Sequence, residues 1–203
     1  MLDLSSNNGV DHDFAIAYAR GGQRRVYLKA VQGTGYVNPD YALLRPRALA
    51  AKLHVGAYDY LEPLADSPRA AAEFLFERLP SPLVGGRDLR PALDVEQGPA
   101  SPGVGAWVSE VAAVIRRETG VRPLVYGSPF FLEACEFVSP PGPLWLADYG
   151  PDDGRNHPVT AVPRPWRAFA AHQFTDRANV SGIDGPCDLS YVRSPAQIEV
   201  PAA

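Results

Sequence analysis

Two carboxylates lie two residues apart in the stretch PALDVEQG, residues 91–98, at the end of an apolar run typical of a β-strand. Asp94 and Glu96 would project to the same face of an extended segment, with Cα atoms roughly 6.5–7 Å apart. In a concave, partly dry site two such groups repel each other and lose water, which raises at least one pKa. One protonated acid beside one carboxylate is what glycoside hydrolysis requires. The spacing alone is equally consistent with two side chains that extend into water.

Polar and aromatic residues also lie at the ends of the other predicted strands. Strands buried on both faces are normally continuous apolar runs, so these residues break the expected pattern. In a parallel β/α barrel, ligands bind at the carboxyl ends of the strands. We therefore expect one polar mouth formed by Asp3, Lys29, Tyr58, Asp59, Tyr60, Asp94, Glu96, Tyr126, Asp148, Tyr149, Gln173 and Asp188.

Taken singly, these residues carry weaker signals. Lys29 is more consistent with a buried ion-pair partner for one of the acids than with a direct catalytic role, and Asp3 and Asp188 could cap loops. Each aromatic residue by itself is more often part of a core than a ligand platform. Together they would suit a sugar, whose CH face stacks on aromatic rings; the aromatic set is Tyr58, Tyr60, Tyr126, Trp145 and Tyr149.

Short β-branched or aromatic runs alternate with helical segments, which is typical of strands in a parallel sheet linked by helices. About eight strands are predicted, at residues 2–5, 26–30, 54–61, 91–96, 123–127, 144–149, 168–175 and 187–192. Helices are predicted at about 13–20, 39–52, 67–79 and 103–119, with one or two further turns after residue 127. The pattern predicts an irregular α/β barrel, similar to a TIM barrel, whose C-terminal half is poor in helices.

The chain of 203 residues, 46% of them hydrophobic, is most simply a single catalytic barrel domain over residues 1–203. We expect residues 193–203 to be a surface tail or a linker remnant. A net charge of −4 without a cluster of Lys and Arg argues against nucleic-acid and anionic-membrane partners. No apolar window has the length of a membrane span, and the first residues lack a secretory signal. We expect a monomer.

Other chemistries have less support. The four histidines and two cysteines lack metal-ligand spacing, so we expect no metal and no cofactor. Cys135 and Cys187 could be a disulfide or two thiols. The serine runs lack the GxSxG elbow, and the glycines of VQGTGY do not form a dinucleotide or phosphate-binding motif.

Eight segments in order resemble the glycoside hydrolase family 25 muramidases, over about residues 1–192. They are DLSSNNG, YLKAVQGTGYVNPDY, HVGAYDYLEP, PALDVEQG with the Asp-x-Glu signature, TGVRPLVYGSP, LWLADYG, HQFT and GIDGPCDLSYV. The resemblance implies an irregular β/α barrel that hydrolyses the β-1,4 bond between N-acetylmuramic acid and N-acetylglucosamine in bacterial peptidoglycan. One departure is Asp59, which follows Tyr58 where many relatives have an aromatic residue or histidine.

The same resemblance implies roles for individual residues. Glu96 would be the general acid and Asp94 its carboxylate partner, with Asp3 and Asp188 as supporting acids. The sugar sites would be lined by Tyr58, Tyr60, Tyr126, Trp145, Tyr149 and Gln173, beside Lys29. Asp94 could act as nucleophile, as base, or as a guide for the substrate's own N-acetyl group. The third route is favoured because both acids leave one strand.

Two classes of function remain open at this stage. The first is an endo-acting muramidase, either a phage endolysin held in the host cytoplasm until its release or a secreted enzyme whose leader was removed. The second is a non-catalytic domain that binds cell wall or glycan on the same barrel. The intact Asp94 and Glu96 favour the enzyme, whose activity should peak on the acid side of neutrality.

Overall fold

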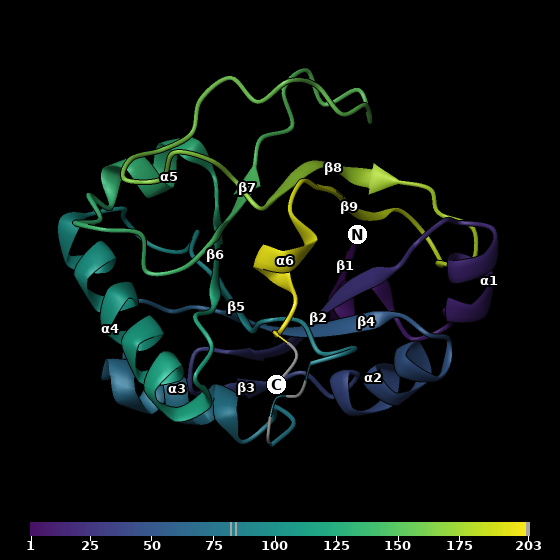
Figure 1. Cartoon of the computed structure of the whole chain (residues 1–203), viewed down its shortest axis with the longest axis horizontal. Helices are drawn as coiled ribbons and strands as arrows, with labels where there is room; N and C mark the ends of the chain where they lie inside the picture. The colour runs from purple at the N-terminus through teal and green to yellow at the C-terminus, as the bar shows by residue number, and fades with distance from the viewer. Residues whose placement is uncertain (82, 84, 202–203) are drawn as a thin grey trace.

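Eight strands close into a barrel in the computed structural model, which describes residues 1–81, 83 and 85–201 (Figure 1). The strand order is β1-β9-β8-β7-β6-β5-β4-β2, and pairing of β1 with β2 closes the ring. A ninth strand, β3, pairs with the end of β2. The bounds are β1 Leu2–Leu4, β2 Arg25–Gln32, β3 Tyr36–Val37, β4 His54–Tyr60, β5 Ala92–Asp94, β6 Leu124–Gly127, β7 Leu144–Ala147, β8 Ala171–Ala178 and β9 Cys187–Val192.

The barrel is parallel except at β9, which runs antiparallel to both β8 and β1. All eight predicted strands are present, and the predicted irregular barrel is confirmed. The sequence analysis missed β3, although the Gly-Thr-Gly turn between β2 and β3 is a hairpin signal. The direction of β9 matters for the site, because its first residues, rather than its last, lie beside the carboxyl ends of the other strands.

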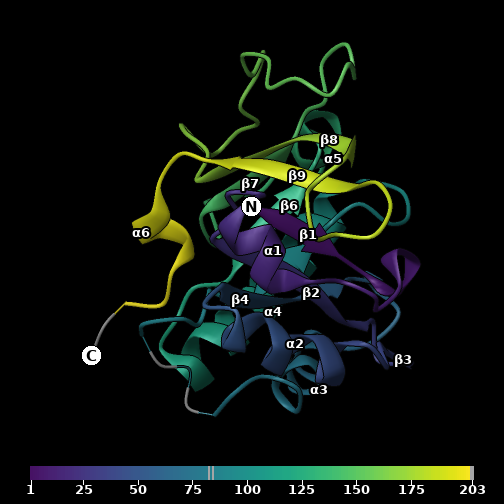
Figure 2. The same ribbon diagram turned by 90° about the vertical axis from the view of Figure 1, so that its right-hand side faces the viewer.

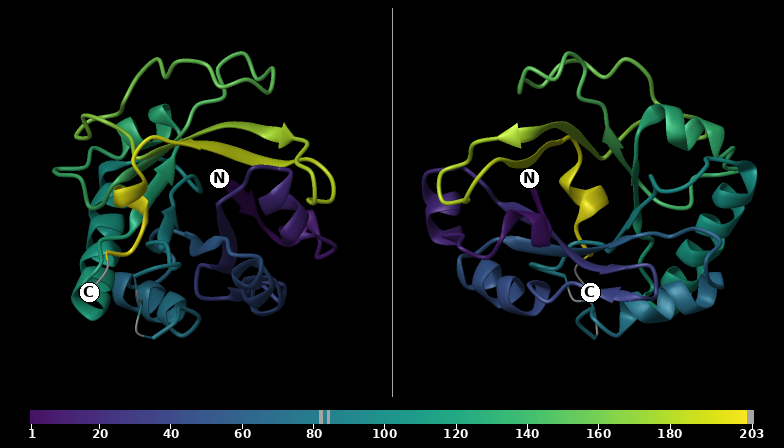
Figure 3. Two further views of the ribbon diagram at one scale, coloured as in Figure 1. Left: turned by 45° about the vertical axis from the view of Figure 1, so that its right-hand side comes forward. Right: turned by 180° about the vertical axis from the view of Figure 1, so that it is seen from behind.

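Helices cover the outside of the first half of the barrel (Figures 1 and 3). After the 3₁₀ turn Ser6–Asn8 they are α1 Phe14–Ala19, α2 Tyr41–Ala50, α3 Pro68–Phe76, α4 Pro102–Thr119 and α5 Pro129–Ala134. Ser67, Ser101 and Ser128 accept backbone N–H bonds at the starts of α3, α4 and α5, and each is followed by a proline at the first helical position.

The second half of the barrel is poor in helices, as predicted. Between α5 and α6 (Pro195–Ile198) the described residues form strands and loops, and β8 and β9 cross one side of the barrel beneath long loops (Figure 3). None of the described helices combines the length and apolar character needed to cross a bilayer.

Alternation along the strands creates two separate cores. Residues such as Leu28, Ala57 and Leu93 point outward and pack against the helices. Residues of the opposite faces fill the barrel interior with large aromatic rings, among them Tyr27 and Trp145, whose ring centroids are 4.8 Å apart. The interior is therefore a packed core on which the residues of the mouth rest.

Gly56 of β4 is required by this aromatic interior. A Cβ at Gly56 would lie 2.2 Å from a ring carbon of Tyr27, which is fully buried and donates its hydroxyl hydrogen to the Arg90 carbonyl at 2.8 Å. We expect Gly56→Ala to lower the free energy of unfolding by about 1–3 kcal/mol, because the ring cannot move away without strain. Urea denaturation measures the change. Gly35→Ala is the control, since a Cβ at Gly35 meets no atom within 4 Å; equal losses for both variants would contradict the explanation.

The C-terminal segment is not the surface tail that we predicted. Helix α6 lies outside one end of the barrel, at the left of the view in Figure 2. Ile198 and Val200 are buried, and the Ile198 carbonyl accepts a bond from Arg90 N at 2.8 Å. Glu199 pairs with Arg25 at 2.6 Å, just where β2 begins. The described part of residues 193–203 thus closes the N-terminal end of the barrel. Packing there removes its apolar side chains from water, which is favourable.

Candidate active site

Asp94 lies in the centre of a row of neighbouring side chains at the mouth of the barrel. The strand register pairs it with Tyr60 of β4 on one side and with Tyr126 of β6 on the other. The Asp94 carbonyl accepts a bond from Leu61 N, and Val95 N donates to the Tyr126 carbonyl, so the backbone around this position is fixed on both sides. Asp94 therefore projects from a rigid strand end, between two tyrosines.

Asp94 and Glu96 share one face of the chain, as their spacing predicts. Val95 between them packs in the outer core, whereas Ala92, two residues before Asp94, lies in the barrel interior. The side chain of Asp94 is 8% exposed, while Glu96, just beyond the strand, is exposed to solvent. Desolvation raises the pKa of Asp94 well above its ordinary value, and the charge of Glu96 raises it further. Partial desolvation also raises the pKa of Glu96, which Lys29 opposes.

Asp3 and Asp188 join this acid pair from the closing strands of the barrel. They are direct neighbours in the β1–β9 register. Burial raises the pKa of Asp3 well above its usual range, with further contributions from Asp188 and Glu96. Burial likewise raises the pKa of Asp188 to about 6, with a contribution from Asp176. The antiparallel direction of β9 is what brings Asp188, its second residue, to the mouth.

Three of the predicted aromatic residues surround the acids. Tyr58 and Tyr126 are almost fully buried in the interior core, while Tyr60 at the end of β4 is half-buried. Burial raises the pKa of all three phenols, and the charges of the nearby acids raise it further. Tyr149, beyond β7, is half-buried and forms a side-chain hydrogen bond with Tyr126. Protonated phenols beside the acids are available as hydrogen-bond donors.

Trp145 and Gln173 lie below the mouth instead of on its surface, and each is 1% exposed. The Trp145 indole N–H donates to Ser190 Oγ at 3.0 Å, so the ring supports the interior. Gln173 forms a side-chain hydrogen bond that lowers the pKa of Asp188 and thereby opposes the effect of its burial. Because both residues are buried, they support the mouth from below. The sequence analysis had predicted instead that they contact the sugar.

Lys29 does not form the predicted ion pair, since no described carboxylate lies within 4 Å of its ammonium group. Its Nζ donates to Gln32 Oε1 at 2.7 Å and lies 4.6 Å from the centroid of the Tyr60 ring. The Gln32 amide in turn donates to Glu62 at 2.9 Å. Desolvation lowers the pKa of Lys29, and the mouth acids, Asp94 first, oppose this. The positive charge of Lys29 thus lowers the pKa of Asp94 and Glu96 from a distance, without a direct ion pair.

Gln32, Glu62 and Tyr36 are the residues that the sequence analysis missed here. Tyr36 lies on β3, with its ring centroid 5.8 Å from the Lys29 ammonium and its hydroxyl bonded to Ser6 at 3.2 Å. The hairpin signal at Gly33–Gly35 could have placed Tyr36 beside the mouth, whereas nothing in the sequence pairs Gln32 with Glu62.

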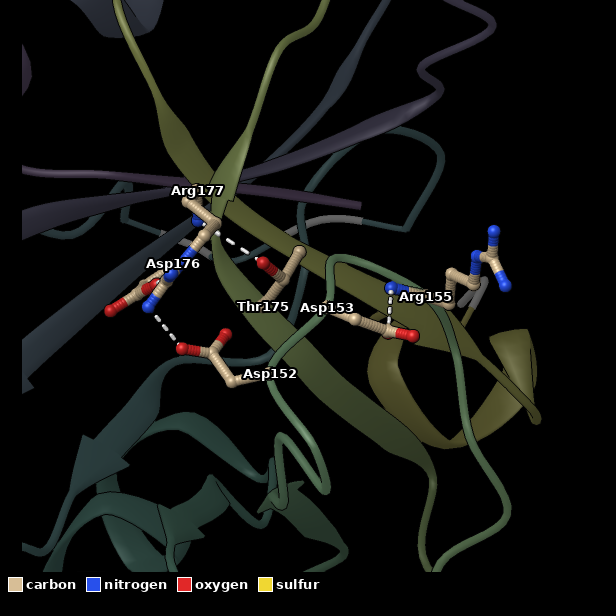
Figure 4. A network of polar contacts seen from close by, with 6 residues as sticks. All are labelled: Asp152, Asp153, Arg155, Thr175, Asp176 and Arg177. Carbon is tan, nitrogen blue, oxygen red and sulfur yellow. Dashed lines mark hydrogen bonds and ion pairs between the residues drawn. The ribbon is translucent and has the colours of Figure 1, made fainter.

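The loop after β7 is tied to β8 next to the site. Asp148, expected at the mouth, instead accepts hydrogen bonds from Gly150 and Thr160 within this loop. Figure 4 shows Arg177 of β8 reaching Asp152 of the loop. Asp176, whose charge helps to raise the pKa of Asp188, lies beside Arg177.

Asp59 lies on the face of β4 opposite to Tyr58 and Tyr60, outside the mouth where we expected it. Its side chain is 0% exposed, and neither carboxylate oxygen has a hydrogen-bond partner among the described residues. Desolvation raises the pKa of Asp59 to about 8; the nearby Gly33 backbone N–H, whose hydrogen bond goes to the Tyr60 carbonyl at 3.0 Å, and the charge of Lys29 oppose it. The departure from the family pattern at Asp59 therefore affects the packing behind β4, and not the residues that face the mouth.

The mouth leaves acceptor atoms for a ligand. Among the described residues, one carboxylate oxygen of Asp3, one of Asp94 and the side-chain amide oxygen (Oε1) of Gln173 are buried without a partner. Buried acceptors in this state are expected to receive donors from a bound molecule. Hydroxyl and amide groups of a sugar are such donors. The described part of the chain holds no group of three or more His, Cys, Asp or Glu arranged to bind a metal ion.

The family model for the glycosyl hydrolases family 25 matches residues 2–183. The chain belongs to glycosyl hydrolase family 25. Among curated relatives, it is similar to an autolytic lysozyme of Clostridium acetobutylicum, at 26% identity over 196 residues, and to lysozyme M1 of Streptomyces globisporus, at 22% over 179 residues. These matches cover 93% and 82% of this chain but only 54% and 59% of the two relatives. The chain therefore spans little more than half of their length.

Solved structures agree with the family 25 fold. A bacterial lysozyme from Streptomyces coelicolor superposes with a TM-score of 0.83 at 22% identity, covering 96% of this chain and 92% of that one. A muramidase from Trichobolus zukalii gives 0.80 at 24% identity, with 96% and 93% covered. At these identities the likeness establishes the barrel, and the chemistry of the site must be argued from its own residues.

Proposed function

We propose that this chain is a peptidoglycan hydrolase that cleaves the β-1,4 bond between N-acetylmuramic acid and N-acetylglucosamine. The observation that carries the proposal is the pair Asp94 and Glu96 on one face at the barrel mouth, both with raised pKa. Membership of family 25 and similarity to proteins named lysozyme and muramidase support the substrate.

In the proposed reaction, Glu96 protonates the oxygen of the leaving sugar. Its exposure at the strand end gives a glycan access to its carboxyl group, and its raised pKa favours the protonated form. The sugar rings would pack on Tyr60 and Tyr149, the half-buried aromatic residues of the mouth. Lys29 supplies a positive charge that limits the mutual repulsion of the acids.

Asp94 is the second carboxyl group of the mechanism. Its deep burial suits a group that acts on the substrate within hydrogen-bond distance, either at the anomeric carbon or at the N-acetyl nitrogen. Attack by Asp94 or by the substrate's acetamide retains the anomeric configuration, whereas a base that activates water inverts it. We favour the acetamide route, because Asp94 and Glu96 leave the same strand. The configuration of the first product, followed by NMR, tests retention.

The direct test incubates the chain with purified peptidoglycan and measures new reducing ends, with mass spectrometry of the released fragments. Fragments with N-acetylmuramic acid at the new reducing end are expected. Fragments with N-acetylglucosamine at the reducing end would place the cleavage at the other glycosidic bond. A chain that binds the polymer without releasing any fragment would instead be a glycan-binding domain.

Activity should be highest on the acid side of neutrality. The active form carries a proton on Glu96, so the rate falls as the pH rises through the raised pKa of that group. At lower pH the rate falls again, once the Asp94–Glu96 pair takes up its second proton; because the pKa of Asp94 is also raised, this fall lies above the range of an ordinary aspartate. Initial rates measured between about pH 3 and pH 9 give the profile. A rate that still climbs above about pH 8 contradicts the assignment of the acid.

A further inference from the structure

A pocket of about 500 Å³ lies on the outside of the barrel, between the last turns of α4 and the loop that precedes β7. Three arginines line it, Arg116, Arg117 and Arg122, and none of the described residues that line it is acidic. We refer to it as the arginine pocket. The sequence analysis predicted no basic cluster, because the net charge of the chain is −4. The fold brings Arg122 to the same pocket as Arg116 and Arg117.

The arginine pocket lies at the opposite end of the barrel from the acids. Arg122 comes two residues before β6, and the loop residues Pro140 and Pro141 come shortly before β7. These are the N-terminal ends of parallel strands, whereas Asp94 and Glu96 lie at the carboxyl end of β5. An anion in the pocket would therefore leave the mouth free for substrate.

Arg122 is held in place by the loop on the far wall of the pocket. Its Nε donates to the Pro141 carbonyl at 3.1 Å, and one terminal nitrogen donates to the Pro140 carbonyl. Arg90 adds positive charge behind it, because an Arg90 terminal nitrogen donates to the Arg122 carbonyl at 3.2 Å. This guanidinium is therefore preorganised, and its other terminal nitrogen makes no hydrogen bond with a described residue.

The other two arginines keep most of their donors. The guanidinium of Arg116 has no hydrogen bond or ion pair with a described residue. Arg117 uses only its Nε, at 3.2 Å from Glu118, in an ion pair whose side chains are both at least half exposed. Such a surface pair is weak and is easily exchanged for a better anion. Ala112 and Ala113, whose side chains are small and uncharged, also line the pocket.

Three arginines around one pocket suit a phosphate, whose oxygens accept paired, charge-assisted hydrogen bonds. A nucleic acid fits less well. None of the described lining residues is aromatic, so bases would find no stacking surface, and a duplex backbone needs an extended basic stripe. A polymer with a phosphate at every repeat and no bases to stack matches a single, local pocket.

We propose that the arginine pocket binds phosphate groups of a phosphodiester polymer attached to the bacterial cell wall. The choice of this polymer rests on the proposed function, which brings the chain to peptidoglycan. The net charge of −4 causes the chain to be repelled by wall phosphates. A second contact with the cell wall, through the arginine pocket, would keep the chain near the glycan that it cleaves. Phospholipid headgroups share the phosphodiester chemistry and are separated from the polymer by the test.

The test measures co-sedimentation with insoluble walls in the Glu96→Gln background, so that binding is read without hydrolysis. Walls that carry the polymer are compared with the same walls after its removal with hydrofluoric acid. We expect the chain to bind polymer-bearing walls about fivefold better than stripped walls, and added salt to remove the difference. Arg116→Gln with Arg117→Gln should reduce binding to the level of stripped walls.

The matched control is Arg20→Gln with Arg69→Gln, which changes the net charge equally at exposed positions away from the pocket. The control should bind like the parent. Equal binding of both double variants, or equal binding to both kinds of wall, overturns the proposal. Stronger arginine-dependent binding to phosphatidylglycerol vesicles or to duplex DNA than to walls overturns it as well. Loss of hydrolysis on every substrate by the parent chain would instead reject the proposed function and leave this binding result standing.

Discussion

Glu96→Gln is expected to lower kcat on purified peptidoglycan by about 10²–10⁴-fold, which is the contribution of a general acid. Glutamine keeps the size and hydrogen bonding of the side chain but cannot transfer a proton. Because Glu96 lies beyond the end of β5 and is exposed, the substitution should leave folding intact. Release of reducing ends gives the rate, and near-UV circular dichroism with thermal unfolding verifies the fold.

Glu73→Gln is the control for this experiment. Glu73 is an exposed carboxylate on α3, paired with Arg69 at 2.6 Å, and lies outside the mouth. Its activity should match the parent. If Glu96→Gln and Glu73→Gln hydrolyse peptidoglycan at similar rates, the acid must be another group, and Asp94, the more deeply buried carboxyl group, becomes the first alternative to test.

Asp59→Asn is expected to stabilise the chain increasingly as the pH rises. Asp59 is fully buried, and its pKa is raised from 3.8 to about 8. Between these values the folded chain keeps a proton that the unfolded chain releases, so the free energy of unfolding of the parent falls as the pH rises. Asparagine does not ionise. The advantage of the variant should therefore grow by about 1.4 kcal/mol per pH unit from roughly pH 5 to pH 7, and level off above pH 8.

Urea denaturation of parent and variant at several pH values measures this difference. Asp11→Asn, which removes a carboxylate at an exposed position, is the control for the change of charge. A constant offset between the Asp59→Asn variant and the parent would mean that Asp59 is already ionised in the folded chain. In that case a charge partner, such as Lys29, must approach it more closely than the structure indicates.

Asp59 and two residues of the barrel interior were placed wrongly, for different physical reasons. Its position beside Tyr58 and Tyr60 suggested a place at the mouth, but strand alternation turns it to the opposite face. Trp145 and Gln173 have the chemical types of sugar-binding residues, yet they lie one layer too deep. Residue type and strand position were therefore good guides to the region of the barrel, while depth depended on how neighbouring rings pack.

Strand periodicity, helix caps and the Asp-x-Glu spacing belong to local stretches of chain, and the sequence by itself determined them. The alternating elements predicted the barrel, and the two-residue spacing put Asp94 and Glu96 on one face. Only the tertiary structure decided that β9 runs antiparallel and places Asp188 beside Asp3. It also decided that the segment with α6 closes the N-terminal end of the barrel and that three arginines line one pocket. These features depend on contacts between segments far apart in the chain, whose relative placement is set by packing and leaves no periodic pattern in either segment.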